Sequence, residues 1–198
     1  MKASAIRPVI KSALYILAAY FSFSGTIAAE VFIRFGPARE GLPGESKDEV
    51  FRGAEGWNQV ASFQWAVTAD TSWTKGGGAS VGKPSPQSFE VTRKVDAASA
   101  GLLRAILTGT SFSTVEVVVR DHSRSGATDT AAVPLRYEFT GVFMTSIAPA
   151  GDSLSPVETV SFVFKTITMK YRPVLEDGQL GKEIVVSWDV PAGTVTGP

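Results

Sequence analysis

The sequence predicts a mainly β fold: a small antiparallel β-barrel with one short α-helix. Most of its patterned segments alternate apolar and polar residues with a period of two, which is typical of half-buried strands. Only residues 96–109 show helical spacing instead. The apolar residues of 158–172 change parity near Lys165 and Thr166. That change indicates a bulge, which lets a strand bend around a closing sheet and favours a barrel over a flat sandwich.

The expected strands follow one another along the chain at 31–35, 57–67, 89–95, 115–120, 135–147, 158–172 and 184–190. In the first, Val31, Ile33 and Phe35 share one face, and the longest regular alternation runs from Leu135 to Ile147. Stretches rich in glycine and proline separate the strands at 36–49, 75–86, 122–132, 149–156 and 175–182. We expect these to be connecting loops.

One amphipathic helix is expected between the third and fourth strands. Asp96 is a favourable N-cap residue, and Gly109 a favourable residue after the helix end. Apolar residues stand between them at helical spacing: Ala98, Leu102, Leu103, Ile106 and Leu107. We expect this helix to cover one end of the barrel.

The net charge of zero hides two unlike parts. The 198 residues include 19 Lys+Arg and 19 Asp+Glu; three of the basic ones and no acid fall in residues 1–29, which leaves residues 30–198 with a net charge of −3. The basic start is followed by an apolar run at 13–21 and small residues at 25–29, the order typical of a secretory signal peptide. The run is shorter than the roughly 18 residues of a membrane span. We therefore predict a signal peptide at 1–29, with cleavage after Ala29 or Ala28, and one exported barrel domain at 30–198, periplasmic or secreted.

Composition excludes several classes of site. The chain has no cysteine, which excludes disulfides, cysteine-ligated metals and a thiol nucleophile. Its single histidine excludes any site that needs two imidazoles. No basic run is interleaved with aromatic residues, so a nucleic-acid partner is not expected. No sequence motif has metal-ligand spacing, and we predict neither a metal nor a cofactor.

Three local motifs suggest chemistry but lack its other parts. Gly77–Lys83 resembles a phosphate-binding loop, yet Pro84 follows where a Ser or Thr and a helix are needed. Gly151-Asp-Ser-Leu154 resembles a serine-esterase block, but no histidine follows His122 to act as its base. Asp121, His122 and Ser123 are adjacent on an expected strand end, where neighbouring side chains point to opposite faces, so they do not form a triad. We predict that the protein is not an enzyme.

A series of motifs resembles a known family. Gly41-Leu-Pro-Gly-Glu-Ser46, after a short first strand, is similar to the Gly-x-x-Gly-Glu-Ser signature of Hcp proteins, the haemolysin-coregulated tube subunits of type VI secretion. The likeness continues in order at 62–65, 88–99, 158–165, Tyr171 with Pro173, 177–178 and 187–190. It covers essentially all of residues 30–198.

The resemblance implies a small β-barrel with one helix and a hexameric ring that stacks into a hollow tube able to carry effector proteins in its lumen. Such rings use head-to-tail surfaces rather than catalytic groups. In the family, an extended loop after the first strands contacts neighbouring subunits, which here corresponds to 41–52. The contact residues implied are Gly41, Leu42, Pro43, Gly44, Glu45, Ser46, Asp48 and Phe51. Phe51 stands where family members commonly carry a histidine.

Three functions remain open at this stage. The first is an exported, ring- and tube-forming component of a type VI secretion system, with effectors as possible cargo. The alternative is an exported Hcp-fold binding or carrier module in the periplasm or outside the cell that is not part of a tube. The third, weighed least, is a hydrolase whose serine or carboxylate site the sequence does not reveal.

Overall fold

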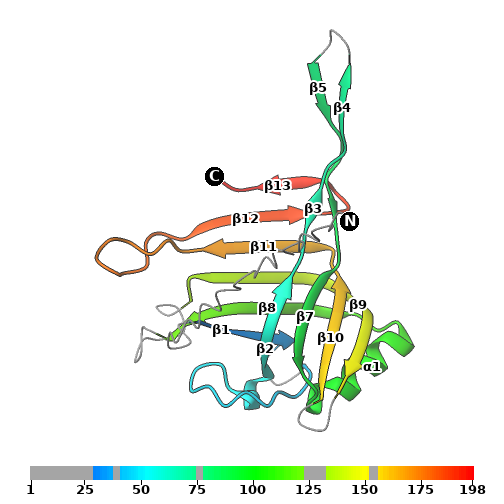
Figure 1. Ribbon diagram of the computed structural model, residues 1–198, viewed down its shortest axis with the longest axis vertical. Coiled ribbons are helices and arrows are strands. Elements are labelled where there is room, and N and C mark those ends of the chain that lie inside the picture. The colour runs from blue at the N-terminus through cyan, green and yellow to red at the C-terminus, as the bar shows by residue number, and fades with distance from the viewer. Residues whose placement is uncertain (1–28, 38–40, 75–77, 123–132, 152–155) are drawn as a thin grey trace, which may run out of the picture.

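The computed structural model describes residues 29–37, 41–74, 78–122, 133–151 and 156–198 (Figure 1). Apart from Ala29, the signal peptide predicted at 1–29 lies outside these residues. Among the described residues, no helix combines the length and apolar character needed to cross a membrane.

The described chain is mainly β, with one α-helix. Its strands are β1 (Ala29–Phe35), β2 (Trp57–Gln64), β3 (Val67–Thr68), β4 (Thr71–Thr74), β5 (Gly78–Val81), β6 (Ser85–Pro86), β7 (Phe89–Lys94), β8 (Phe112–Asp121), β9 (Leu135–Ala150), β10 (Val157–Val163), β11 (Thr166–Tyr171), β12 (Ile184–Asp189) and β13 (Thr194–Thr196). The helices are α1 (Ala97–Thr108) and the single-turn 3-10 helix η1 (Gly53–Glu55).

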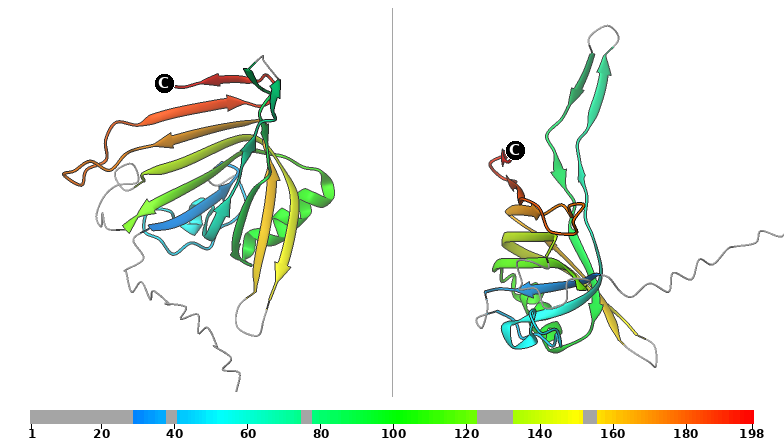
Figure 2. Two further views of the ribbon diagram at one scale, coloured as in Figure 1. Left: turned by 45° about the horizontal axis from the view of Figure 1, so that its top comes forward. Right: turned by 90° about the vertical axis from the view of Figure 1, so that its left-hand side faces the viewer.

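Six strands close into a barrel. They follow the order β10-β7-β2-β1-β8-β9, and β9 pairs with β10 again, so the ring has no free edge there. Every pairing is antiparallel. Strands β11, β12 and β13 continue the sheet outward from β9 as a wing beside the barrel (Figure 2). The predicted antiparallel β-barrel with one helix is confirmed.

The long strand β9 explains the parity change in the sequence. Its first part pairs with β11 and its second part with β10. Phe164 and Ile167 are both buried, at 8% and 4% exposed, although they differ in parity. At the division, Gly141 has φ +58° and a Cβ there would lie 2.9 Å from Lys165 Cβ. The segment expected as one bulged strand is thus two strands, and the parity change marks where the chain passes from barrel to wing.

Helix α1 forms as its sequence predicts. The Asp96 side chain accepts a hydrogen bond from the Ala98 N–H at 2.8 Å, and the helix ends at Gly109, whose φ is +65°. Its buried residue Leu102 belongs to the main barrel core, while Leu107 is 77% exposed. The helix lies against β9 at one end of the barrel (Figure 1).

A projecting arm was not predicted from the sequence, and neither were the short strand β13 and the 3-10 helix η1. Strand pairs β3–β6 and β4–β5 continue β2 and β7 away from the barrel as a two-stranded ribbon (Figures 1 and 2). We call the described residues between Ala66 and Gln87 the arm; the Gln87 N–H donates to Ala66 O at 2.8 Å at its base. Residues 75–86 are predicted to be a loop because they are rich in glycine and proline, whereas the structure places β5 and β6 within them.

Candidate functional site

Residues 41–52, here called the signature loop, are held against the barrel by close backbone approach. A Cβ on Gly41 would lie 2.1 Å from Phe35 O, and one on Gly44 would lie 2.2 Å from Trp57 O. The loop is bonded there as well: the Leu42 N–H donates to Phe35 O at 2.9 Å, and the Ser46 N–H donates to Trp57 O at 3.1 Å. Both glycines of the signature are therefore required by contact with β1 and β2.

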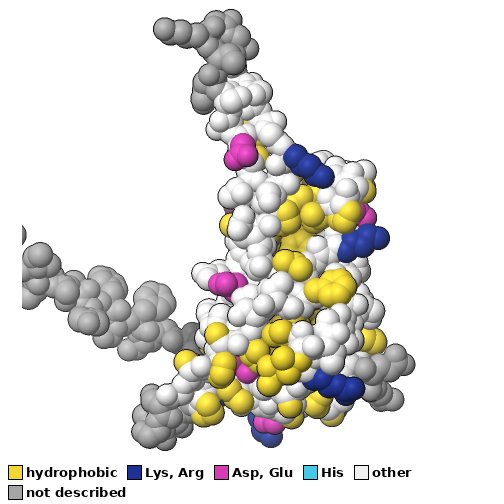
Figure 3. Space-filling model, turned by 90° about the vertical axis from the view of Figure 1, so that its right-hand side faces the viewer, with side chains coloured by type: hydrophobic (Ala, Val, Ile, Leu, Met, Phe, Trp, Pro, Cys, Tyr) yellow, Lys and Arg dark blue, Asp and Glu magenta, His cyan; other side chains and the backbone are white. Residues whose placement is uncertain are grey.

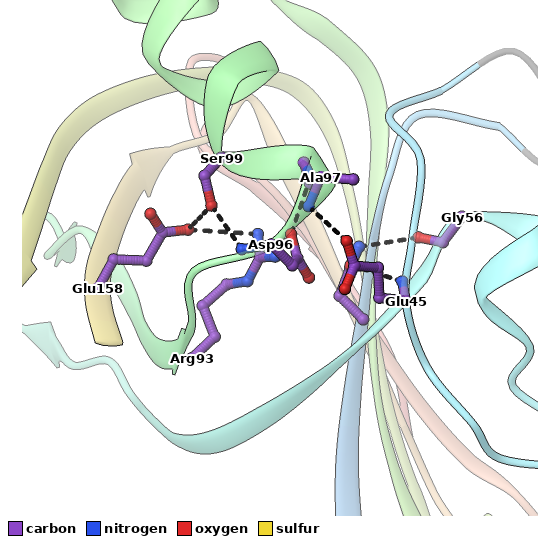
Figure 4. A network of polar contacts seen from close by, with 9 residues as sticks. Glu45, Gly56, Arg93, Asp96, Ala97, Ser99 and Glu158 are labelled. Atoms are coloured by element: carbon purple, nitrogen blue, oxygen red, sulfur yellow. Dashed lines mark hydrogen bonds and ion pairs between the residues drawn. The ribbon is translucent and has the colours of Figure 1, made fainter. Parts of the chain in front are cut away.

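Glu45 joins the signature loop to helix α1. Its carboxylate Oε1 accepts a hydrogen bond from the Ala97 N–H at 3.0 Å, in the first turn of the helix (Figure 4). This satisfies one of the N–H groups left free at a helix start, and the negative charge complements the helix dipole. Its own N–H donates to Oδ1 of the buried Asn58 at 3.3 Å, whose Nδ2 donates to Gly56 O at 3.1 Å.

A buried ion network fixes the same helix start to the barrel. The side chain of Arg93 is fully buried and contacts Asp96 through Nη2 and Glu158 Oε1 through Nη1, the latter at 3.5 Å (Figure 4). Ser99 Oγ donates to Glu158 Oε1 at 2.9 Å and accepts from the Asp96 N–H at 3.0 Å. Removing one partner would leave a buried charge unpaired. Arg93 shares the inward parity of Phe89 and Val91, which was the only sequence signal for this network.

Asp48 organises the second half of the loop. Its Oδ1 accepts hydrogen bonds from the N–H groups of Val50 and Phe51 at 2.8 and 2.7 Å, and Arg120 Nη1 contacts its Oδ2. Partial burial raises the pKa of Asp48, but the N–H groups of Phe51 and Val50 and the Arg120 guanidinium together outweigh it. The pKa is therefore below its ordinary value, and Asp48 is an anion at neutral pH.

Phe51 lies in the interior of the folded chain. It is 1% exposed, stacks on Phe32 with ring centroids 5.2 Å apart, and meets Trp57 edge-on at 4.9 Å. These three residues form a second hydrophobic core with Val118 and Val133. The other residues expected at a subunit contact are exposed at Pro43 and Glu45, and partly buried at Gly41, Leu42, Gly44, Ser46 and Asp48.

The remaining candidate motifs are only partly described. Residues 78–81 of the glycine-rich sequence form β5, and strand β6 follows rather than a helix. Residues 152–154 of the esterase-like block and Ser123 lie outside the described residues. His122 Nε2 lies 2.9 Å from Glu30 Oε2, at the start of β1.

Comparison with known proteins decides the family. Residues 33–171 match the family model described as the type VI secretion system effector Hcp. The chain belongs to the Hcp family. This establishes it as a component of a type VI secretion system, as the signature loop and its motif series indicated. No curated protein matches the chain.

Solved structures share the Hcp fold. One described as a type six secretion system protein superposes with a TM-score of 0.72 at 26% identity, covering 85% of this chain and 100% of that one. Hcp1 from Salmonella typhimurium gives a TM-score of 0.65 at 22% identity, over 85% and 99% of the two chains. A type VI secretion system effector from Yersinia pestis gives 0.54 at 25% identity, over 81% and 99%.

Proposed function

We propose that this Hcp-family protein is a structural subunit that assembles into hexameric rings, and that the rings stack into a tube. It acts by assembly and not as an enzyme, with effector proteins as cargo of the lumen. Residues 1–29 serve as an export signal, and residues 30–198 are the assembling domain. The proposal rests on the family and, in the structure, on the arm.

The arm has the properties of an element completed by another molecule. Among the described residues, β4 pairs only with β5, and β3 only with β6, so both edges of the ribbon are open. Val67 and Val81 on it are 42% and 68% exposed. A two-stranded ribbon is marginally stable in water by itself, so packing against a neighbouring copy would stabilise it.

The barrel also offers an apolar surface. Hydrophobic side chains gather on the face that carries α1, β9 and β10 (Figure 3). Phe143 of β9 and Val163 of β10 are paired across the sheet and are 48% and 42% exposed. A contiguous exposed apolar patch often marks a protein interface.

The exposed residues Pro43 and Glu45 are the proposed contacts of the signature loop. Asp48 and Phe51 hold this loop in place.

Shortening the arm tests the proposal. Thr68 and Ser85 are paired residues of β3 and β6, so joining them by Asn-Gly gives a two-residue hairpin and leaves the barrel intact. We expect the natural protein to form rings and tubes in negative-stain micrographs, and the shortened protein to lose the tubes while its circular dichroism still shows a folded barrel. Tubes of unchanged length would contradict a role for the arm.

Two further measurements separate the open alternatives. Native mass spectrometry of the natural protein should show hexamers; a monomer even at high concentration would favour the exported carrier module. N-terminal sequencing of protein recovered from the producing cells should begin at Glu30, or at Ala29 if cleavage follows Ala28. Protein that retains Met1 would contradict the export signal without affecting ring formation.

A further inference from the structure

We propose that Glu30, Asp48 and His122 bind one divalent transition-metal ion of the Zn²⁺ type. Glu30 is at the start of β1, Asp48 is in the signature loop, and His122 directly follows β8. One donor atom from each side chain lies within 4.8 Å of the other two. The three are far apart in the sequence, which is why motif spacing predicted no metal site.

The contact between His122 and Glu30 is the main observation. His122 Nε2 approaches Glu30 Oε2 to 2.9 Å. Yet this nitrogen atom, which is itself buried, makes no hydrogen bond with any of the described residues. A nitrogen and a carboxylate oxygen this close together can also share a cation as ligands.

Asp48 is already oriented as a ligand. Its Oδ1 is held by the N–H groups of Val50 and Phe51, and its Oδ2 by Arg120. Each carboxylate oxygen has a second lone pair, so these bonds leave coordination possible. Carboxylates that bind metals are commonly hydrogen-bonded in this way by surrounding groups, which fix their direction. Arg120 takes that outer position here, and Lys47 and Glu49, of opposite charge, line the same cavity.

The dimensions suit a small ion after a modest side-chain movement. Zn²⁺ bonds to nitrogen and oxygen are about 2.0–2.2 Å, so its ligands lie about 3–4 Å apart. The side chains of His122 and Glu30 are 33% and 27% exposed, so small changes in their side-chain torsion angles can bring their atoms to these distances. All three residues line a cavity of about 450 Å³, with room for water as a further ligand. One imidazole with two carboxylates favours Zn²⁺ over Mg²⁺ or Ca²⁺, which take oxygen ligands alone.

A metal ion here would tie the start of β1 and the end of β8 to the signature loop. The loop's position beside α1 and β2 would then depend on metal as well as on its hydrogen bonds. This inference concerns one subunit and does not require ring formation.

Calorimetric titration of the full chain tests the site. The protein is prepared without a histidine tag, stripped with EDTA and titrated with ZnCl₂. We expect one ion per chain, with no binding of MgCl₂ under the same conditions. His122 is the only histidine, so the proton NMR spectrum has one imidazole to follow. Its signals should shift with Zn²⁺ and broaden with Co²⁺.

Three variants locate the ion. His122→Gln and Glu30→Gln should each weaken Zn²⁺ binding at least about tenfold. Glu49→Gln removes the same charge as Glu30→Gln from the same cavity but not a ligand, and it should bind as the natural protein does. Circular dichroism without metal checks that each variant is folded. If His122→Gln does not fold, the response of the imidazole signal to Zn²⁺ in Glu30→Gln decides whether Glu30 is a ligand.

Three results would overturn the assignment. The first is the absence of saturable Zn²⁺ binding. The second is a Glu49→Gln variant whose Zn²⁺ binding is weakened as much as that of Glu30→Gln, which would show charge attraction alone. The third is an imidazole signal that Zn²⁺ leaves unmoved. The last would leave His122 and Glu30 as an ordinary ion pair.

Discussion

Replacing Phe51 by alanine tests whether the signature loop is anchored by a core of its own. Phe51 is 1% exposed and packs between Phe32 and Trp57. Truncating a buried phenylalanine costs about 3–5 kcal/mol, and the two ring contacts place this site well inside that range. The second core has five buried members, so few neighbours are available to fill the cavity. We expect Phe51→Ala to lower the free energy of unfolding by about 3–4 kcal/mol.

Urea unfolding followed by tryptophan fluorescence measures this loss, because Trp57 touches the Phe51 ring and reports on its surroundings. Pro43→Ala is the matched control: it lies in the same loop but is exposed, and it should change the free energy of unfolding by less than about 0.5 kcal/mol. Both variants are compared at one protein concentration, since assembly also stabilises the folded chain. A loss below about 1 kcal/mol for Phe51→Ala would refute the anchoring argument. Lost assembly with unchanged stability would instead make Phe51 a contact residue.

Three further outcomes follow from the same loop. Gly44→Ala places a Cβ 2.2 Å from Trp57 O, a backbone atom that cannot rotate away, so thermal unfolding should show a loss of about 2 kcal/mol or more. The pKa of Asp48 is lowered in the folded state, so its carboxylate stabilises the fold above the unfolded pKa of about 4, and this is lost as pH falls through the folded value. Asp48→Asn should therefore lower Tm at neutral pH, and the gap should close in acid. Glu45→Ala removes the acceptor for the Ala97 N–H and should cost about 0.5–1 kcal/mol in urea unfolding, whereas Glu45→Gln keeps an acceptor and should cost less.

Local patterns predicted most of the barrel. Alternation with period two located β1, β2, β7, β8, β9 and β12, and the capping residues Asp96 and Gly109 bounded α1. The alternation also placed Arg93 on the inward face, but not its partners. The arm was missed because β4 and β5 consist largely of threonine, serine, glycine and alanine, and so lack the apolar signal of a strand that faces a core.

For the signature loop, the order of residues indicated the family, and the family match over 33–171 bears this out. The physical roles of those residues came only with the fold. Glu45 meets Ala97, and Asp48 meets Arg120, across long stretches of chain. Phe51, expected from the resemblance at a subunit contact, is placed in a core by Phe32 and Trp57.

The features that the sequence predicted differ from those that only the fold decided for a physical reason. Neighbouring residues set which face of a strand is apolar, where a helix begins and where the parity of a strand changes. These features can therefore be predicted along the chain. Which strands meet depends on packing and on the closure of long loops, which no local pattern encodes. The sequence therefore determined most of the barrel strands and the helix, whereas the tertiary structure decided the β9–β10 closure, the projection of the arm and the meeting of Glu30, Asp48 and His122.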